Sequence, residues 1–363
     1  MAGFLERALL DLGGDEALQA YRKYGDAGVD FSQIHPTQLR QTVKTLRNMP
    51  PPPPPTIYRD NILGGLAEDL DVPQEPMQRW QPAENYSSIV TERIPERMNL
   101  MLQDMAAAPP GADRWYDNAA LLREFQHHHG DLKGRELFDQ HMRLVAGTSS
   151  GKPVPQNIVQ ASDLDDKLQR GLLPHVYSKA ESADFLDRNP GYFREGAGSV
   201  TQQNDLMLGG LMARDPRYAF ERAIQSQSPQ KIFSFQSNLT GNLNPATLDR
   251  HEAHFLNTPF ETGKDGKRKH RQLRTNEYVL AEPYYKGMAE MMSPMVGRRM
   301  SPAQVQGLRW TGGGPRTGVK STEPTFVHEY EEVVKRAADT LGISPQELLA
   351  EHIKYRAYLG DKQ

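Results

Sequence analysis

Cysteine is absent from all 363 residues of the chain. Its absence excludes disulfide bonds, zinc–thiolate sites, iron–sulfur clusters and a thiol nucleophile within this sequence. Long apolar runs are missing too, because no stretch approaches the length that a membrane-spanning helix needs. The first residues also lack a basic leader followed by an apolar core. We therefore expect a cytoplasmic protein without a membrane-spanning segment.

An excess of charge of either sign is also lacking, since 43 basic residues face 46 acidic ones and the formal net charge is -3. Such a balance gives no global argument for nucleic acid, so any nucleic-acid site has to be local. The apolar share of 37% is low for a compact globule, and so is the mean hydropathy of -0.68. Part of the chain is therefore expected to be extended or wrapped on a partner.

The composition changes along the chain and predicts three segments. Residues 1–48 are expected to form short helices, interrupted where Gly13 and Gly14 break the apolar spacing. Six consecutive prolines, Pro50–Pro55, favour polyproline II. Residues 49–112 are therefore predicted as an extended, proline-rich arm that contacts a protein partner. Residues 113–363 are predicted as one helical domain.

Helix signals dominate this last segment. Leu137, Phe138, Met142 and Val145 share one side of an expected helix over 132–145. Capping pairs recur, since Ser178 precedes Glu181, Ser301 precedes Gln304 and Ser344 precedes Glu347 by three positions each. No pair of segments has a convincing two-residue hairpin turn between strands. The expected fold is an all-α, irregular multi-helix domain.

One window has a spacing that suggests chemistry. Lys231 opens an apolar segment, a Gly/Asn/Pro turn interrupts it, and Asp249 with His251 opens the next helix eighteen positions after the lysine. Cleavage of an N-glycosidic bond builds positive charge on the sugar, and a carboxylate beside it stabilises that charge. The alternative is that Asp249 is an ordinary cap or dipole partner at a helix N-terminus.

The run from Lys231 to Leu256 resembles the end of the helix-hairpin-helix DNA glycosylase domain, in which a hairpin lysine precedes an Asp-x-His element at a similar spacing. It is more closely similar to helical bacteriophage proteins with Lys-x-x-Ser-Phe-x-x-Asn-Leu-x-Gly before Pro-x-Thr-x-Asp-x-His. Related phage domains include pyrophosphorylases of modified thymine bases. The resemblance implies that Asp249 is the catalytic carboxylate, Lys231 the Schiff-base lysine and His251 the histidine that follows the aspartate.

The same resemblance suggests further site residues and one departure. A Thr-Ser segment before Pro-x-Asn is expected to line the pocket, and the predicted pocket residues are Thr148, Ser149, Asn157 and Asn238. Predicted DNA contacts come from Arg250 and from a basic cluster, whose members are Lys264, Lys267, Arg268, Lys269 and Arg271. The alternative for this cluster is a solvated loop. The expected hairpin, Gln225–Gln230, contains no glycine, unlike the family's Leu-Pro-Gly-Val-Gly.

Other chemical motifs are weaker. His127–His129 and His141 lack a metal-ligand spacing, so neither a metal nor a cofactor is expected. The glycine run Gly312–Gly314 lacks the Gly-Lys-Ser/Thr ending of a nucleotide-binding loop and is expected to be a flexible connection anchored by Trp310. A serine nucleophile in Thr148–Ser150 has no histidine–acid partner by spacing.

Two functions therefore stand side by side. The first is a phage-type helical protein with a DNA-glycosylase-like domain that acts on or binds DNA bases or modified nucleotides, as a hydrolase of N-glycosidic bonds. The second is a non-catalytic structural protein of a phage virion that uses the helical domain as a scaffold. They imply a place in the host cytoplasm or in the virion.

Overall fold

The computed structural model of the chain describes residues 2–50, 84–193, 200–215, 229–256, 260–262, 268–270, 273, 275–317 and 323–360. The chain divides into two compact units, each built from two separate stretches. Unit 1 comprises Met1–Tyr116 and Gly241–Thr325, and unit 2 comprises Asp117–Thr240 and Phe326–Gln363. This division differs from the single domain expected over 113–363, because residues 241–325 pack with the N-terminal stretch.

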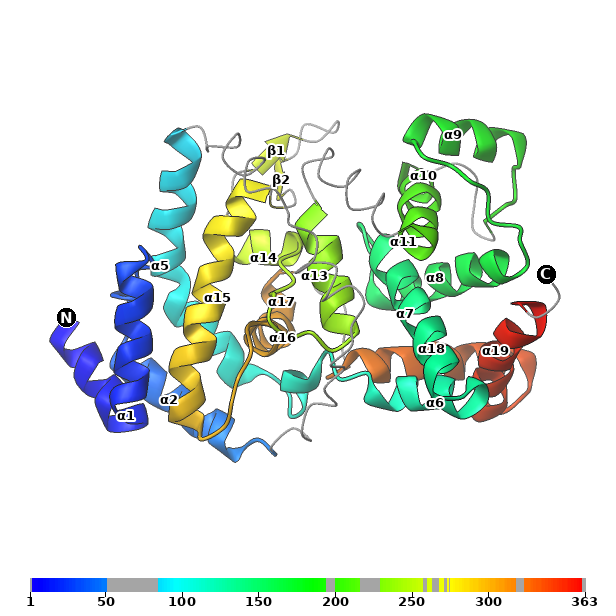
Figure 1. The fold of residues 1–363 in the computed structure, drawn as a ribbon. Helices are drawn as coiled ribbons and strands as arrows, with labels where there is room; N and C mark the ends of the chain where they lie inside the picture. The colour runs from blue at the N-terminus through cyan, green and yellow to red at the C-terminus, as the bar shows by residue number, and fades with distance from the viewer. Residues whose placement is uncertain are drawn as a thin grey trace. The chain divides into compact units, whose positions relative to one another are not determined.

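The expected all-α fold is confirmed (Figure 1). The elements of unit 1 are α1 (Ala2–Asp26), α2 (Pro36–Asn48), α5 (Glu84–Ala107), the 3-10 helix η1 (Ala112–Arg114), α14 (Arg250–Phe255), β1 (Phe260–Thr262), β2 (Arg268–His270), α15 (Thr275–Val296), α16 (Pro302–Gly312) and α17 (Gly314–Thr317). Those of unit 2 are α6 (Ala119–His129), α7 (Asp131–Gly147), α8 (Val154–Gln169), α9 (Lys179–Arg188), α10 (Val200–Asn204), the π-helix η2 (Asp205–Gly209), α11 (Gly210–Arg214), α13 (Pro229–Leu239), α18 (Phe326–Leu341) and α19 (Pro345–Gly360).

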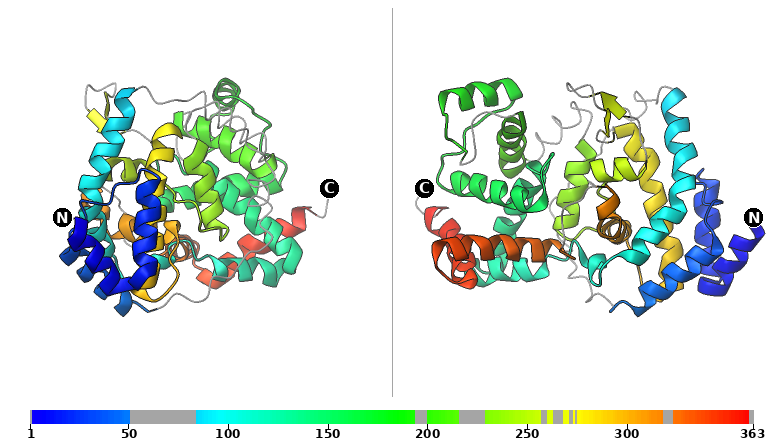
Figure 2. Two further views of the ribbon diagram at one scale, coloured as in Figure 1. Left: turned by 60° about the vertical axis from the view of Figure 1, so that its left-hand side comes forward. Right: turned by 180° about the vertical axis from the view of Figure 1, so that it is seen from behind.

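Helix α15 is the centre of unit 1. Helix α1 packs along it, α2 packs on α5, and α16 contacts both α5 and α15 (Figures 1 and 2). Helix α1 is kinked where expected, since Gly14 has the non-helical angles φ 62° and ψ -158°. Glycine adopts a positive φ at little cost in conformational free energy, so the helix can change direction at this position.

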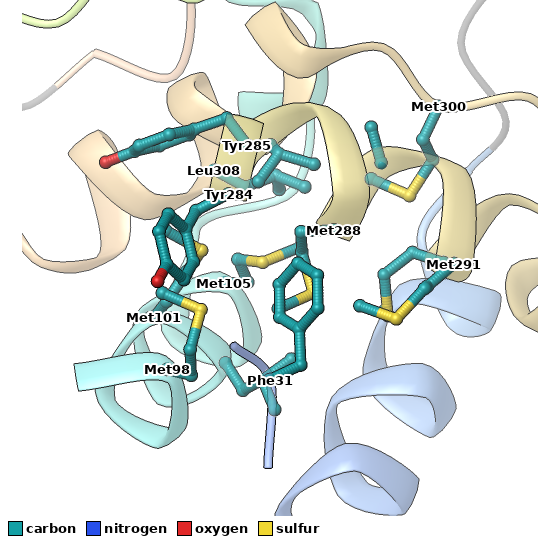
Figure 3. Close-up of a cluster of buried hydrophobic side chains, with 14 of the residues drawn as sticks. Phe31, Met98, Met101, Met105, Tyr284, Tyr285, Met288, Met291, Met300 and Leu308 are labelled. Atoms are coloured by element: carbon teal, nitrogen blue, oxygen red, sulfur yellow. The ribbon is translucent and has the colours of Figure 1, made fainter. Parts of the chain in front are cut away.

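The core of unit 1 is rich in methionine. Figure 3 shows Met98, Met101 and Met105 of α5 gathered with Met288 and Met291 of α15, all of them buried. Aromatic rings complete the cluster, and Phe31 meets Tyr284 edge-on with ring centroids 5.7 Å apart. Unbranched thioethers adapt to irregular gaps, which suits packing between helices such as α5 and α15.

Helix α5 lies within residues 49–112, which were predicted to form an extended arm. Its side chains Ile94, Met98, Met101, Leu102 and Met105 are completely buried. Their spacing of three and four positions forms one apolar helical stripe. The arm expected over 49–112 therefore does not extend through Glu84–Ala107, and its residues 51–83, with the prolines from Pro51 onward, lie outside the described residues.

Helix α7 is the centre of unit 2. It contacts α6, α8, α11 and α13, while α18 and α19 pack on each other and on α8. The stripe expected on α7 is confirmed, because Leu137, Phe138, Met142 and Val145 are all buried. Helix α18 buries Phe326 and Tyr330 near its start, whereas Leu341 at its end is 62% exposed.

All three expected capping pairs are confirmed. Ser178 and Ser344 each accept a hydrogen bond from the backbone three residues ahead, and Ser301 with Gln304 forms a reciprocal capping box at α16. Two short strands accompany the helices. Strands β1 and β2 pair antiparallel with Glu261 opposite Lys269, and five residues separate them, so no two-residue turn joins them.

Candidate functional site

Asp249 is the N-cap residue of α14. Its backbone is extended, and its Oδ1 accepts hydrogen bonds from the backbone N–H groups of His251 at 2.8 Å and Glu252 at 3.1 Å. The carboxylate thus satisfies two of the free N–H groups of a helix that is only six residues long. The side chain is half-buried, and its Oδ2 accepts no hydrogen bond from any residue that the structure describes.

Buried tyrosines fix the backbone just before Asp249. The Tyr278 hydroxyl donates to the carbonyl of Ala246 and accepts from the N–H of Leu248 at 3.1 Å. The N–H of Ala246 donates to Oε1 of Glu282 at 3.2 Å. The side chain of Tyr116 is hydrogen-bonded to Thr247, and burial raises the pKa of Tyr116 well above its ordinary value. Three consecutive residues are therefore held before the cap.

A buried ion pair fixes the backbone just after Asp249. Glu252 and Arg309 are both 0% exposed, and Nε and Nη2 of Arg309 donate to Oε1 of Glu252 at 2.9 and 2.6 Å. The Tyr285 hydroxyl donates to Oε2, and Gln306 donates to Oε1 at 3.3 Å. Burial raises the pKa of Glu252, and the Arg309 guanidinium opposes that rise. A buried carboxylate needs such partners because its desolvation is costly.

The guanidinium of Arg309 also faces a second acid. Its Nη1 lies 3.9 Å from Oδ2 of Asp104 on α5, and the other oxygen of Asp104 accepts from Arg316. The guanidinium of Arg309 also lies over the ring of Phe255, with Cζ 4.5 Å from the ring centroid. Helix α14 is therefore connected through one arginine to α16 and α5.

The histidines of α14 connect it to α17. His251 and His254 direct Nδ1 at the same carbonyl, that of Thr317, at 2.9 and 3.4 Å. A carbonyl only accepts, so Nδ1 carries the proton in whichever ring makes the bond. The predicted catalytic histidine, His251, is thus next to Asp249 through its backbone and directs its ring at α17.

The predicted basic residues fall into three groups. Arg250 is exposed at the first position of α14. Arg268 and Lys269 lie in strand β2, where Lys269 stands opposite Glu261 in the antiparallel register. Lys264, Lys267 and Arg271 lie outside the described residues. The segment 241–325 as a whole carries 13 lysines and arginines against 8 acidic residues, so the local excess of positive charge lies in the stretch that contains Asp249.

The remaining predicted residues lie in unit 2, around the end of α7. Lys231 of α13 donates to Oγ of Ser149, and Thr148 donates to Oδ1 of Asn157 at 2.7 Å. Asn238 is buried on α13. The structure brings Lys231, Thr148, Ser149 and Asn157 together, and it does not bring Lys231 and Asp249 into one unit.

Sequence reasoning missed Glu252, Arg309 and Asp104. A signal is present in retrospect, because Glu252 and Arg309 each stand next to apolar residues in a short helix, Glu252 beside Ala253 and Arg309 between Leu308 and Trp310. A charge among such residues is rarely buried without a partner of opposite sign. Glu252 and Arg309 are 57 positions apart in the sequence, so no short window of residues indicates that they pair.

A second buried ion pair, in unit 2, gives a prediction about pH. Lys152 Nζ lies 2.6 Å from both oxygens of Asp205, and burial raises the pKa of Asp205 from 3.8 to about 6 although Lys152 opposes the rise. Because the folded state binds this proton more tightly, the contribution of Asp205 to stability is present below pH 3.8 and is lost as the pH rises through 6. Between pH 4 and 7 the free energy of unfolding of the wild type should fall by about 2–3 kcal/mol relative to that of Asp205→Asn. Urea unfolding followed by circular dichroism measures this difference, and parallel pH profiles would contradict it.

Comparisons with protein-family models, with curated proteins and with solved structures find no significant match to this chain. Among the described residues, no group of three or more acidic or histidine side chains is placed to hold a metal ion. No described helix is long and apolar enough to cross a membrane. The case for a function therefore depends on the geometry around Asp249.

Proposed function

We propose that this chain is a phage-type, DNA-glycosylase-like protein that hydrolyses the N-glycosidic bond of a nucleotide in DNA, with Asp249 as the carboxylate that stabilises the developing charge. One observation carries the proposal. Asp249 has one oxygen fixed by two backbone N–H groups and the other without a hydrogen-bond partner among the described residues, on a half-buried side chain. The second oxygen has acceptor capacity for a ligand.

The chemistry needs little more from the residue than a fixed negative charge. Departure of the base leaves an oxocarbenium-like sugar, and a carboxylate beside it lowers the energy of that state. A carboxylate that is already oriented costs no reorganisation when the charge develops. A single-oxygen cap leaves the other oxygen available for this electrostatic contact or for a water molecule.

The contacts on both sides of Asp249 support this function over simple capping. An exposed six-residue helix needs only its cap, worth about 1 kcal/mol. Here the preceding residues bond to Tyr116, Tyr278 and Glu282, and the following turn holds the buried Glu252–Arg309 pair. Buried charge is costly, and its best use is to fix one conformation. The network holds the Asp249 backbone in place from both directions.

A DNA partner is supported by the local charge. Arg250 adjoins Asp249 on the exposed side of α14, and the β1–β2 hairpin that follows contains Arg268 and Lys269. Lysines and arginines of this kind bind phosphates without reading sequence, and such binding weakens steeply with salt. Affinity for duplex DNA should therefore fall when salt is raised.

The test uses DNA that mimics the charged sugar, because the target base need not be known. One duplex carries a cationic pyrrolidine in place of one nucleotide, and a matched duplex carries a neutral tetrahydrofuran. Wild-type protein should prefer the cationic duplex by about tenfold or more, equivalent to about 1.4 kcal/mol. Asp249→Asn and Asp249→Ser should abolish this preference, since both residues keep the N-cap and remove the charge.

Three controls make the result specific. The neutral duplex should bind all variants equally, the exposed Asp15→Asn should keep the preference, and unfolding midpoints of the Asp249 variants should stay close to wild type. Equal binding of the two duplexes by wild type would contradict a glycosylase site. Binding of neither duplex at low salt would favour the alternative, a non-catalytic structural protein.

A further inference from the structure

Lys231 and Ser149 are in direct contact in unit 2. Nζ of Lys231 donates to Oγ of Ser149 and lies 3.4 Å from the carbonyl oxygen of the same residue. The ring of Phe235, one turn further along α13, lies 5.1 Å from Nζ. Both side chains are largely enclosed, with exposed fractions of 8% for Lys231 and 9% for Ser149.

This arrangement meets the geometric requirement for an activated nucleophile. A serine hydroxyl and a base must lie within hydrogen-bond distance, and a third group must orient the base. Here the Ser149 carbonyl and the Phe235 ring orient Lys231. A lysine amine that serves as base must be neutral, because only the neutral amine has a lone pair that can accept the serine proton. We infer that Ser149 and Lys231 form a serine–lysine dyad that transfers small acyl groups from esters or activated amides.

The turn that carries Ser149 is held rigidly. Thr148 ends α7, and its hydroxyl donates to Asn157 at 2.7 Å while its carbonyl accepts from Lys152 at 3.0 Å. Gly147 packs directly on the π-helix η2, where a Cβ on Gly147 would lie 2.8 Å from Cα of Gly209. A nucleophile on such a turn keeps one position, as efficient attack requires.

The reaction needs a single reorientation of the hydroxyl hydrogen. At rest, Oγ of Ser149 donates to the carbonyl of Ala146 at 2.8 Å. In the reactive state that hydrogen turns to Nζ of the neutral Lys231. Oγ then bonds to the carbonyl carbon while the proton passes to Nζ, and Nζ returns it to the departing alcohol or amine. Water, activated by the same amine, releases the acyl group and restores the serine.

A small fluorophosphonate tests this dyad directly. Attack forms an Oγ–phosphorus bond, fluoride leaves, and the proton goes to Lys231. Wild-type protein should gain one adduct by intact mass, located on Ser149 by peptide mapping. Ser149→Ala should abolish it, Lys231→Met should slow it at least tenfold, and the neighbouring Ser150→Ala should leave it unchanged. Asp249→Asn should also leave it unchanged, which keeps this result independent of the proposed function in unit 1.

A second measurement uses the absence of cysteine. Ser149→Cys introduces the sole thiol of the chain, so alkylation by iodoacetamide has no background. With Lys231 beside it, the thiol should react as a thiolate at lower pH than the thiol of Ser150→Cys, and the added Lys231→Met should remove that difference. No fluorophosphonate adduct on Ser149, or identical pH–rate profiles for the two cysteine variants, would overturn the dyad.

Discussion

Arg309→Met is expected to lower the free energy of unfolding of unit 1 by about 3–5 kcal/mol. The change removes the guanidinium that neutralises Glu252 and leaves that carboxylate at 0% exposure without its ion-pair partner. It also removes the cation from the face of Phe255 and from the side of Asp104. The loss should be large because the penalty comes from the acids left behind in a medium that solvates them poorly.

The measurement has a built-in reporter. All three tryptophans, Trp80, Trp115 and Trp310, belong to the stretches that make up unit 1. Tryptophan fluorescence during urea unfolding therefore follows unit 1 alone. Because Trp115 and Trp310 lie 4.7 Å apart between ring centroids, their emission should respond to separation of η1 from α16.

Two variants control this prediction. Arg40→Met removes the same side chain from an exposed pair with Asp11 and should cost less than about 1 kcal/mol. The double variant Glu252→Met with Arg309→Met should recover part of the loss, because no unpaired buried charge remains in that pair. An Arg309→Met protein as stable as wild type would show that Glu252 is protonated or hydrated in the folded state.

Gly312→Ala is expected to destabilise unit 1 by about 3 kcal/mol or more, at the upper end of overpacking costs. A Cβ at Gly312 would lie 1.9 Å from the carbonyl oxygen of Asp104 and 2.9 Å from the backbone nitrogen of Ala108. Both obstacles are backbone, so α16 would have to move away from α5. That movement would also disturb the contact of Arg309 with Asp104.

The control is Gly25→Ala near the end of α1, where no atom lies within 4 Å of the added Cβ. This change should be neutral or stabilise by up to about 1 kcal/mol, because alanine has the higher helix propensity. The same fluorescence experiment measures both variants. Equal midpoints for Gly312→Ala and wild type would mean that α16 and α5 are not packed as closely as the structure shows.

Much of the secondary structure could be predicted because its causes are local. Serine caps act within three residues, and apolar stripes repeat every three or four, so the starts of α9, α16 and α19 and the buried face of α7 follow from short windows. The kink at Gly14 follows from the same logic. The glycine run at 312–314 was expected to be a flexible connection, and it instead forms the end of α16 and the start of α17.

Distant packing could not be predicted in the same way. The need for glycine at position 312 comes from Asp104, and the stripe on α5 looked like part of a polar arm because its partners, α15 and α16, lie nearly two hundred residues later. The candidate site shows the same limit. Thr148, Ser149 and Lys231 were selected by resemblance, whereas the buried acids near Asp249 and the hydrogen bonds of the tyrosines there required the fold.

The interleaved order of the two units has a consequence for synthesis on the ribosome. Helices α1, α2 and α5 emerge first, but residues 117–240 must be made before their partners in 241–325 begin to appear. At 5–20 residues per second this takes about 6–25 s. Throughout that interval α5 lacks two of its native partners, α15 and α16. The nascent chain is then most exposed to aggregation and to capture by chaperones.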